Sequence, residues 1–410
     1  MRILFVTPYV PSLIRVRPYN LIKHLSRRHD ITLVALMQGD PSEEDAVEEM
    51  RSYCEKVYLL PVSKWKALVS CGVNLFGRAP LQAAYTFTQS GRRFILQVAE
   101  SGQFDLVHVE HIRGAHLVLG IKGIPRVFDS VDCITRLIKQ RLRDERALTG
   151  RLLNREELFK MRNYEPRIAS LFDGIVMTTE RDRRVLGHLI RRLEARKDSA
   201  ERVHVVRNGV DHEYFKPMEG NLQKDTVVFS GKMGYYPNAA AVLRFYQEAF
   251  PLIRRENPRA RFKIVGSNPP EAVRRLSSDP SVEVTGYVDD IRPHISSAGV
   301  VVCPMTVGVG IQNKMLEAMS MEKPVVASSV ASRGIPDAVD GRHLMLADTP
   351  EETAGCVLDI MRNYRHGVLI GKSSRRLVTE NYSWESVIRV LEGIYNSVFY
   401  EYKHNSARAA

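Results

Sequence analysis

The chain has 410 residues, a formal net charge of +12 and a sequence pI near 9.5. This length is too great for one compact core, so two domains of ordinary size are expected. Hydrophobic residues make up 44% and charged residues 26% of the chain, which excludes a disordered protein. The basic balance favours an anionic partner, such as a phosphorylated ligand, an anionic lipid surface or a nucleic acid.

The cysteines and the N-terminal sequence indicate the cellular compartment. The five cysteines are scattered and odd in number, and none lies at metal-binding spacing, so a reducing cytosol is expected. The first apolar run is short and leads into a turn at Thr7 and Pro8, unlike a signal peptide. The uncharged stretch 295–313 contains Pro304 and three glycines, which predicts a core strand and loop rather than a membrane helix.

Strand patterns alternate with helical patterns along the first half. Residues 2–6 form a continuous apolar run, which is typical of a strand in a parallel sheet covered on both faces. Further strands are predicted at 31–36, 56–61, 106–109, 126–128, 174–178 and 204–207, and helices at 18–28, 43–54 and 92–100. This alternation favours a doubly wound, parallel α/β sheet.

Polar residues near the carboxyl ends of these strands are candidates for ligand contacts, because open α/β sheets bind ligands there. Arg15 and Arg17 follow the first strand and either contact an anion or simply sit in solvent. His108, Glu110 and His111 lie at the end of the strand predicted at 106–109, which puts Glu110 and His111 on the following loop. Histidine is the commonest general acid or base, although a lone histidine is more often structural.

Asp129 and Asp132 follow the next predicted strand. They could orient a histidine or bind acceptor hydroxyls, and a residue of this stretch could equally cap the following helix. No Asp-x-Asp pair occurs, so a divalent metal held by carboxylates is not expected.

The region 136–197 is expected to be helical and is strongly basic, with arginines interleaved with leucines and glutamates. Two interpretations stay open. These are solvated amphipathic faces with i,i+4 ion pairs, or attraction to an anionic membrane surface, where each basic residue adds ~1 kcal/mol. Residues 64–66 and 92–93 could join such a surface. A nucleic acid is not expected, because no recognition motif is present.

A domain junction is predicted within 203–217, where the turn Asn208-Gly209 follows a strand. A second alternating series follows, with strands at 226–229, 261–265, 282–285, 300–303, 324–327 and 343–346 and a helix from Pro237 to about Arg255. We therefore expect two facing α/β domains with a cleft between them, at 1–205 and 206–380. A helix is predicted at 384–402, with a frayed tail at 404–410.

The stretch 303–320 predicts an anion site. A buried strand leads into a loop that contains Gly308 and Gly310, and an amphipathic helix begins near Gln312 or Asn313. The first amides of a helix have no internal partners and attract negative charge. Glycines let the backbone approach a phosphate closely, although they could also serve only to make a turn.

Lys314 and Glu317 are three residues apart on this helix and therefore share a face. Lys314 can meet a phosphate, and Glu317 can accept hydrogen bonds from sugar hydroxyls. This combination suits a nucleotide whose diphosphate and ribose are both bound, and the alternative is a solvated ion pair.

Taken together, these motifs resemble glycosyltransferase family 4, with its type B architecture of two Rossmann-like domains. The resemblance is carried by Asn208-Gly209-Val210-Asp211 with Phe215 and Pro217, Gly231-Lys232, residues 310–319 with 323–327, and Tyr382-Ser383-Trp384. Residues 233–238 with 310–314 are similar to a bacterial subgroup associated with exopolysaccharide and protein-sorting loci. The family also implies that residues 381–410 pack as a helix back on the first domain.

The resemblance implies a role for each matching residue. Glu317 would bind the donor ribose, and Lys232, with the neighbouring Gly231, and Lys314 would hold the diphosphate. Other donor contacts would come from Tyr287, Val288, Gly310, Ile311, Gln312 and Asn313. One of His108, Glu110 and His111 would be the sugar-contacting catalytic residue. Val309 departs from the family, which often has an acid at that position.

The implied activity is retaining transfer of a sugar from a nucleoside-diphosphate sugar to a glycan or lipid-linked acceptor in bacterial polysaccharide biosynthesis. Preorganised amides and cations would stabilise the leaving diphosphate, so neither a metal nor another cofactor is expected. A cytoplasmic protein is expected, with peripheral contact to the inner face of the plasma membrane as an option. The alternatives are a nucleotide-sugar 2-epimerase of the same architecture and a non-catalytic nucleotide-sugar-binding scaffold.

Overall fold

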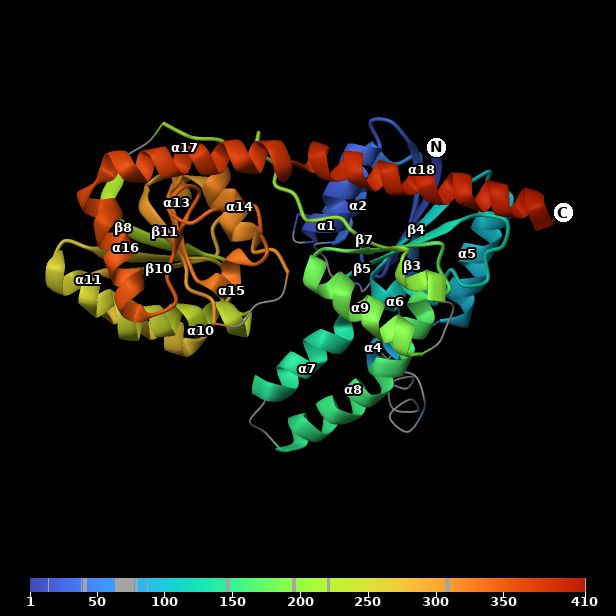
Figure 1. Ribbon diagram of the computed structural model, residues 1–410, viewed down its shortest axis with the longest axis horizontal. Helices are drawn as coiled ribbons and strands as arrows, with labels where there is room; N and C mark the ends of the chain where they lie inside the picture. Colours follow the sequence, from blue (N-terminus) through green and yellow to red (C-terminus); the bar gives the residue numbers. More distant parts are fainter. Residues whose placement is uncertain are drawn as a thin grey trace. The chain divides into compact units, whose positions relative to one another are not determined.

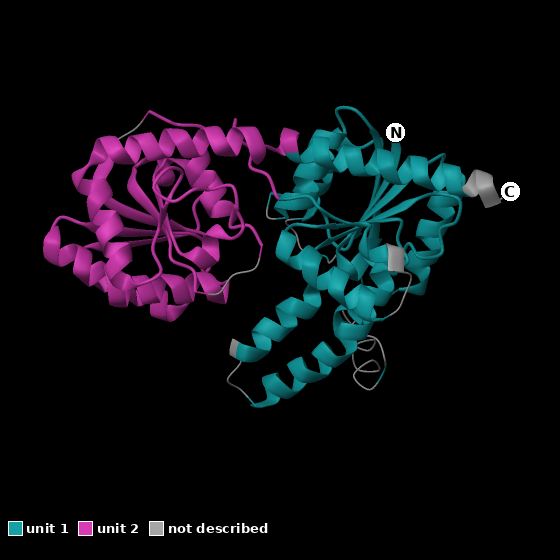
Figure 2. Ribbon diagram, in the orientation of Figure 1, with its two compact units in different colours: residues 1–207, 387–410 teal, residues 208–386 magenta. Residues whose placement is uncertain are grey.

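The computed structural model describes the chain apart from residues 14, 38, 40–42, 63–76, 78–79, 87, 145–147, 194–196, 220–221, 307–309 and 410. The predictions for Gly308, Val309 and residues 64–66 therefore lie outside the described residues. The chain forms two compact units, residues 1–207 with 387–410 and residues 208–386 (Figure 2). The second unit is one continuous segment, whereas the first joins two segments that are far apart in the sequence.

The first unit is built on a seven-stranded sheet with the order β3-β2-β1-β4-β5-β6-β7 (Figure 1). Its strands are β1 (Arg2–Thr7), β2 (Asp30–Met37), β3 (Lys56–Pro61), β4 (Leu106–Glu110), β5 (Arg126–Val131), β6 (Gly174–Met177) and β7 (Val203–Val205). All neighbours pair in parallel. The central strands β1 and β4 are apolar over most of their length, because helices cover both faces of such a sheet.

Helices connect these strands. They are α1 (Val16–Leu25), α2 (Glu43–Tyr53), α4 (Leu81–Thr86), α5 (Gln89–Ser101), α6 (His111–Ala115), α7 (Ile134–Asp144), α8 (Leu148–Ala169) and α9 (Glu180–Arg192), with a 3-10 turn at Lys197–Ala200. Helix α18 (Trp384–Ala409) adds its residues from 387 onward to this unit. A Cβ on Gly174 of β6 would lie 2.8 Å from Val398 of α18, so glycine lets the helix approach the sheet closely.

The second unit has a six-stranded parallel sheet with the order β10-β9-β8-β11-β12-β13. Its strands are β8 (Gln223–Ser230), β9 (Arg261–Val265), β10 (Val282–Gly286), β11 (Ala298–Cys303), β12 (Val325–Ala327) and β13 (Met345–Leu346). This is the strand order of the doubly wound nucleotide-binding fold.

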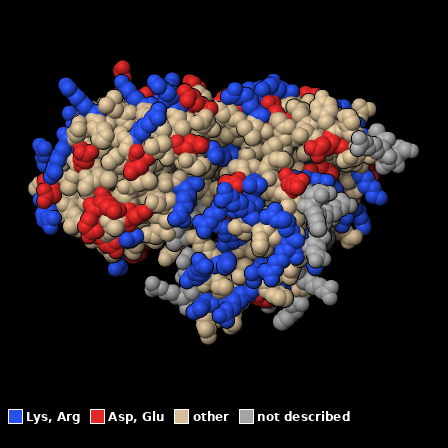
Figure 3. Space-filling model, in the orientation of Figure 1, with Lys and Arg blue, Asp and Glu red and all other residues tan. Residues whose placement is uncertain are grey.

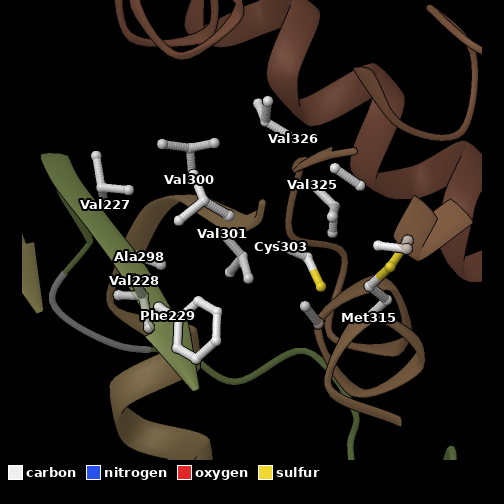
Figure 4. Packing of buried hydrophobic residues seen from close by; sticks show 14 of the residues in the cluster. Val227, Val228, Phe229, Ala298, Val300, Val301, Cys303, Met315, Val325 and Val326 are labelled. Atoms are coloured by element: carbon white, nitrogen blue, oxygen red, sulfur yellow. The ribbon is translucent and has the colours of Figure 1, made fainter. Parts of the chain in front are cut away.

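The helices of the second unit pack around one apolar core. They are α10 (Tyr236–Arg244), a π-helical turn (Phe245–Ala249), α11 (Phe250–Glu256), α12 (Glu271–Arg274), a 3-10 turn (Arg275–Ser278), α13 (Arg292–Ser296), α14 (Asn313–Ser320), α15 (Ser329–Ser332), α16 (Pro350–Arg362) and α17 (Tyr364–Asn381). Figure 4 shows Phe229 of β8, Cys303 of β11 and Met315 of α14 in this core. Burial of Met315 fixes the start of α14 against the sheet.

The predicted fold class is confirmed, because each unit is an α/β layer structure with a parallel sheet. Strands β3 and β9 have the predicted bounds. The units divide at 207/208 and 386/387, beside the predicted boundaries at 205/206 and 380/381.

Several predictions of local structure are wrong. The expected frayed tail at 404–410 is helical to Ala409, whereas the strand predicted at 174–178 is confirmed as β6. The single helix expected from Pro237 to Arg255 contains the π-helical turn. His111 opens α6 instead of lying on a loop. Within the described residues, no helix is long and apolar enough to cross a membrane.

Candidate active site

The strand order reverses between β1 and β4 in the first unit and between β8 and β11 in the second. Open α/β sheets bind their ligands beyond the carboxyl ends of the strands at such a reversal. Glu110 ends β4, Gly231 and Lys232 follow β8, and residues 310–314 follow β11. The topology therefore places candidate residues of each unit where this fold binds ligands.

Two glycines bring the loops after β8 and β9 into close contact. Gly231 has a φ of +143° and Gly266 has a φ of +147°, values that other residues rarely adopt. A Cβ on Gly266 would lie 1.9 Å from the carbonyl oxygen of Gly231. A Cβ on Gly231 would lie 3.1 Å from Cε of Lys314 and 3.0 Å from Nδ2 of Asn238. The loop thus reaches the first turn of α14 at a distance that a larger residue would prevent.

Lys314 ties α14 to this loop. Its side chain is buried, and its Nζ donates a hydrogen bond to Oδ1 of Asn238 at 2.5 Å and lies 4.5 Å from the ring centroid of Phe229. Asn238 in turn donates from Nδ2 to the carbonyl oxygen of Lys232 at 2.9 Å. Burial lowers the pKa of Lys314. Asn238 thus links the amino group of Lys314 to the loop after β8. The predicted contact of Lys314 with a phosphate stays a prediction.

Glu317 lies one turn further along α14 and is half-buried. Burial raises the pKa of its carboxyl to about 7, and the positive charge of Lys314 acts in the opposite direction. Within the described part of the chain, no hydrogen bond to this carboxyl group is found. The oxygens can therefore accept hydrogen bonds from the hydroxyls of a ligand, and the contact with a ribose stays a prediction.

The beginning of α14 has the features of a helix N-terminus that can bind an anion. Gly310 has a φ of +74°, and Gln312 occupies the cap position without a side-chain hydrogen bond to the first amides. The Oδ1 atom of Asn313 is buried and has no hydrogen-bond partner among the described residues. Ile311 is buried and fixes the chain just before the helix. Uncapped amides at this position can bind phosphate oxygens.

The remaining donor candidates lie at the surface of the second unit. Lys232 is exposed, and the described residues give its ammonium group neither a hydrogen bond nor an ion pair. Tyr287 is 74% exposed, and Val288 is half-buried. All three follow strands β8 or β10, so a ligand at this sheet edge can reach them.

In the first unit, Arg17 and Asp129 form a buried ion pair. Nε of Arg17 lies 2.8 Å from Oδ2 of Asp129, and both side chains are almost fully buried. A second nitrogen of Arg17 donates to the carbonyl oxygen of Arg207 at 3.3 Å. The solvent-exposed alternative for Arg17 is therefore wrong, and a direct ligand contact by either residue stays a prediction.

His108 lies in the middle of β4, and its side chain is fully buried. Its Nδ1 is 2.7 Å from the hydroxyl of Tyr395, its Nε2 is 3.8 Å from Oδ2 of Asp129, and its ring stacks on Phe5 at 4.2 Å. Burial lowers the pKa of His108 to about 4, so the imidazole is neutral near pH 7. Among the three catalytic candidates, His108 has the side chain with no exposed surface.

Glu110 is the last residue of β4 and is almost fully buried. Its Oε1 accepts a hydrogen bond from the hydroxyl of Tyr9 at 2.9 Å, and its Oε2 has no partner among the described residues. Burial raises the pKa of this carboxyl to about 8, and the negative charge of Asp129 adds to the shift. Glu110 is therefore protonated near neutral pH and can donate a hydrogen bond from Oε2.

The neighbouring candidates are placed differently. His111 has a φ of +63°, its Nδ1 accepts from the amide of Arg113 at 3.3 Å, and burial lowers its pKa to about 3. Asp132 is half-buried, and burial raises its pKa to about 6 with help from the negative charge of Asp182. Arg15 is exposed, and its guanidinium lies 4.5 Å from the ring centroid of Tyr9.

Three residues of these networks were missed by the sequence analysis. Tyr9 contacts both Arg15 and Glu110. Its position in the loop after the first strand could have identified it as a candidate. Asn238 follows Pro237 at a helix start, where a polar side chain is common. Tyr395 had no local signal, because its partner His108 lies 287 residues away.

In the described part of the chain, the candidates belong neither to a cluster that could hold a metal ion nor to the lining of the cavity found in the second unit. Among the described residues, no group of three or more His, Cys, Asp or Glu side chains could hold a metal ion. A cavity of about 250 Å³ in the second unit is lined by Pro304, Ser328 and Thr353, among others, and not by the donor candidates. The charged and hydrogen-bonding candidates lie instead at the carboxyl ends of the strands.

Two Rossmann-like units of this topology define the fold of the GT-B type glycosyltransferases, and solved structures of that type match almost the whole chain. HepE from Anabaena, solved in complex with UDP, has a TM-score of 0.67 and 14% identity, and the match covers 97% of this chain and 100% of HepE. Sucrose-phosphate synthase from Thermosynechococcus elongatus gives 0.67 and 15%, with 98% and 100% covered. At these identities the likeness shows the fold.

A mutant of TarM from S. aureus is also similar, with a TM-score of 0.65 and 11% identity, and 97% of this chain and 100% of TarM are covered. It was solved in complex with fondaparinux, alpha-GlcNAc-glycerol and UDP. Residues 224–363 match the family described as Glycosyl transferases group 1, and this range lies within the second unit. That range contains every donor candidate from Gly231 to Glu317.

Among curated proteins, the MMP alpha-(1->4)-mannosyltransferase of Mycolicibacterium hassiacum is 27% identical over 213 residues. The match covers 48% of this chain and 49% of that protein, so the chain spans about half the length of the relative it matches.

Proposed function

We propose that this protein is a retaining glycosyltransferase of family 4, which transfers a sugar from a nucleoside-diphosphate sugar to a glycan or lipid-linked acceptor. The proposal is carried by the beginning of α14, where Gln312 does not cap the first amides and where Lys314 contacts the glycine loop after β8. Glu317 lies one turn further along the same helix. This part of the helix lies within the range that matches the glycosyl transferase group. Solved proteins of the same fold bind UDP, which supports a nucleotide-sugar donor.

Each group in the second unit has a chemical task in this proposal. Negative charge builds up on the diphosphate as it leaves, and fixed amides and cations stabilise that charge without reorganising. The amides of α14, Lys232 and the buried charge of Lys314 supply this stabilisation. Glu317 binds the ribose hydroxyls. In the first unit, Glu110 and His111 are the candidates for contact with the sugar.

The biological setting belongs to the same proposal. The resemblance to an exopolysaccharide-associated subgroup supports a role in bacterial polysaccharide biosynthesis. A cytoplasmic location with peripheral contact to the inner membrane surface would bring the protein to a lipid-linked acceptor. The basic balance of the chain supports this contact.

Donor binding is tested first. A thermal-shift panel of nucleoside diphosphates and their sugars identifies the donor, because a bound ligand raises the melting temperature. Calorimetry then compares Glu317→Ala with wild type. The loss of hydrogen bonds to a charged group should weaken binding about 10- to 150-fold. Glu219→Ala, at an exposed acid of the same unit, is the matched control and should leave the affinity unchanged.

Equal donor affinities of wild type and Glu317→Ala would remove Glu317 from the site. Products are then analysed with and without an acceptor. Conversion of the nucleotide sugar without an acceptor would favour the 2-epimerase alternative, and donor binding without any conversion would favour the scaffold.

The proposal includes metal-free chemistry. The positive charge near the diphosphate comes from lysines and amides, so transfer should persist in the presence of a chelator such as EDTA. The rate of transfer is measured before and after chelation. A complete loss that Mg²⁺ restores would contradict this part of the proposal.

A further inference from the structure

Helix α8 of the first unit carries a row of exposed apolar side chains. Leu148, Leu152 and Phe159 are 74%, 59% and 72% exposed. Their spacings of four and seven residues put them on one face of the helix. Contact of such large apolar groups with water is unfavourable, and several of them exposed on one face of a helix mark an interaction surface.

A row of arginines runs beside the apolar row. Arg151, Arg155 and Arg162 each follow one of its members by three positions, and all three are exposed. In the part of the chain that the structure describes, none of the three is held in an ion pair. Residues 134–169 contain ten basic and five acidic side chains. Figure 3 shows Lys and Arg side chains gathered where α7 and α8 lie in Figure 1.

Two of the acids of this segment point inward and are used within the fold. Glu165 is fully buried and accepts hydrogen bonds from the amides of Ile134 at 2.7 Å and Thr135 at 2.9 Å, which caps the start of α7. Glu157 is buried and accepts from the amide of Leu81 at 2.9 Å. These bonds fix α7 and α8 against each other and against the unit. They also leave the outer face with an excess of positive charge.

We propose that this face of α8, which we call the α8 face and define by Leu148, Leu152, Phe159 and the three arginines, docks on an anionic lipid bilayer. The apolar row enters the boundary between headgroups and acyl chains, and the arginines meet lipid phosphates. Charge complementarity selects this occupant, because a symmetric contact between two copies would place two faces of the same positive charge against each other. The inference rests on the proposed function only in that a lipid-linked acceptor lies on such a surface.

The test is co-sedimentation of the full-length protein with vesicles of phosphatidylcholine, with or without phosphatidylglycerol. Wild type should bind the vesicles that contain phosphatidylglycerol, and salt should weaken the binding. Arg151→Gln, Arg155→Gln and Arg162→Gln together should reduce binding by about fivefold for each arginine removed. Leu148→Ser, Leu152→Ser and Phe159→Ser together should abolish it.

Matched controls lie on other elements. Leu369→Ser with Val390→Ser changes apolar residues that are 66% and 51% exposed on α17 and α18. Arg255→Gln with Arg259→Gln changes arginine side chains that are 74% and 84% exposed. Both pairs should bind vesicles like wild type. Every variant is also tested for UDP binding and for its melting temperature, so that a failure of folding or of donor binding is seen separately from a failure to dock.

Vesicle binding by both α8-face variants at the wild-type level would overturn the inference, as would the absence of wild-type binding to anionic vesicles. Sedimentation velocity without lipid tests whether a second copy of the protein occupies the α8 face instead. If wild type self-associates and the apolar variant does not, the α8 face is an interface between copies and the inference is wrong.

Discussion

At the scale of single residues, the donor half of the proposed site depends on two glycines and one buried lysine. Gly231 and Gly266 adopt φ angles that hold the loops after β8 and β9 within contact distance. Lys314 then fills the space beneath the loop and bonds to Asn238. The position of the loop, where the diphosphate is proposed to bind, therefore depends both on the lack of a side chain at the two glycines and on the contacts of Lys314.

Gly231→Ala should lower the free energy of unfolding by about 1–3 kcal/mol, because the backbone conformation is open almost only to glycine. The new methyl group would also press on Lys314 and Asn238, so UDP affinity should fall as well. Urea denaturation and calorimetry measure the two effects. Gly355→Ala is the control, since that exposed helical glycine has nothing within 4 Å of a new Cβ. It should gain up to ~1 kcal/mol.

Glu110 predicts a specific dependence of stability on pH. Burial raises its pKa from 4.5 to about 8, so between these values the folded state holds a proton that the unfolded chain has released. The stabilisation from the neutral carboxyl is complete below pH 4.5 and is lost as the pH rises to about 8. In Glu110→Gln this loss is absent. The stability of the variant relative to wild type should therefore rise by at most ~1.4 kcal/mol per pH unit in that window.

Urea denaturation of wild type and Glu110→Gln at a series of pH values measures this difference. Parallel curves for the two proteins would show that the carboxyl group titrates normally, and the assignment of Glu110 as a neutral hydrogen-bond donor would then be wrong.

At the scale of elements, α18 is held to the first unit by a buried polar contact. The side chains of Tyr395 and His108 are both fully buried, and among the described residues the hydroxyl of Tyr395 and Nδ1 of His108 have a hydrogen bond only to each other. Tyr395→Phe leaves the imidazole nitrogen without its partner. The free energy of unfolding should fall by about 1–3 kcal/mol.

Chemical denaturation checks this prediction. Tyr400→Phe is the matched control, because Tyr400 is 61% exposed on the same helix and its change should stay within about 0.5 kcal/mol. Equal effects of the two substitutions would contradict the assigned contact.

Elements with a strong local signal were predicted well. Strands β3 and β9 are apolar runs with clear limits, and their bounds agree with the sequence analysis. Pro237 correctly indicated a helix start, but the π-helical turn at Phe245–Ala249 has no signature in the pattern. One of the two interpretations left open for α8 made its glutamates solvated partners of the arginines, yet Glu165 is buried and caps α7. Burial depends on tertiary packing, which a helical pattern alone does not contain.

The candidate site was predictable where chemistry follows local order, and not where it depends on distant partners. Glu110 and the helix start at Asn313 lie at the carboxyl ends of β4 and β11, as the sequence analysis expected, and the structure adds that both strands stand at a reversal of strand order. The roles of these residues stay predictions. Sequence spacing gave no indication that Lys314 bonds to Asn238 or that His108 is sealed beneath Tyr395, because these partners come from other elements.

At the scale of the whole molecule, the two units differ in how the chain builds them. Residues 208–386 form a continuous unit whose apolar core extends from Val210 to Tyr382. The first unit needs α18, which buries Ile388, Leu391 and Tyr395. The fragment 208–386 should therefore unfold cooperatively on its own and bind UDP, whereas the fragment 1–207 should expose apolar surface and aggregate.

Thermal denaturation, calorimetry with UDP and size-exclusion chromatography of the two fragments measure these outcomes. A stable, monomeric fragment 1–207 would show that α18 is dispensable for the first unit. Failure of fragment 208–386 to bind UDP, while the intact chain binds it, would place essential donor contacts outside the second unit.

The discontinuous first unit has a consequence for synthesis on the ribosome. Its closing segment, residues 387–410, is translated only after the whole of 208–386. At about 5–20 residues per second, the nascent N-terminal half waits roughly 10–35 seconds for this segment. During that interval its sheet lacks one cover and is a substrate for chaperones. Translation speed across 208–386, and not only the sequence of the N-terminal half, should therefore influence the yield of native protein.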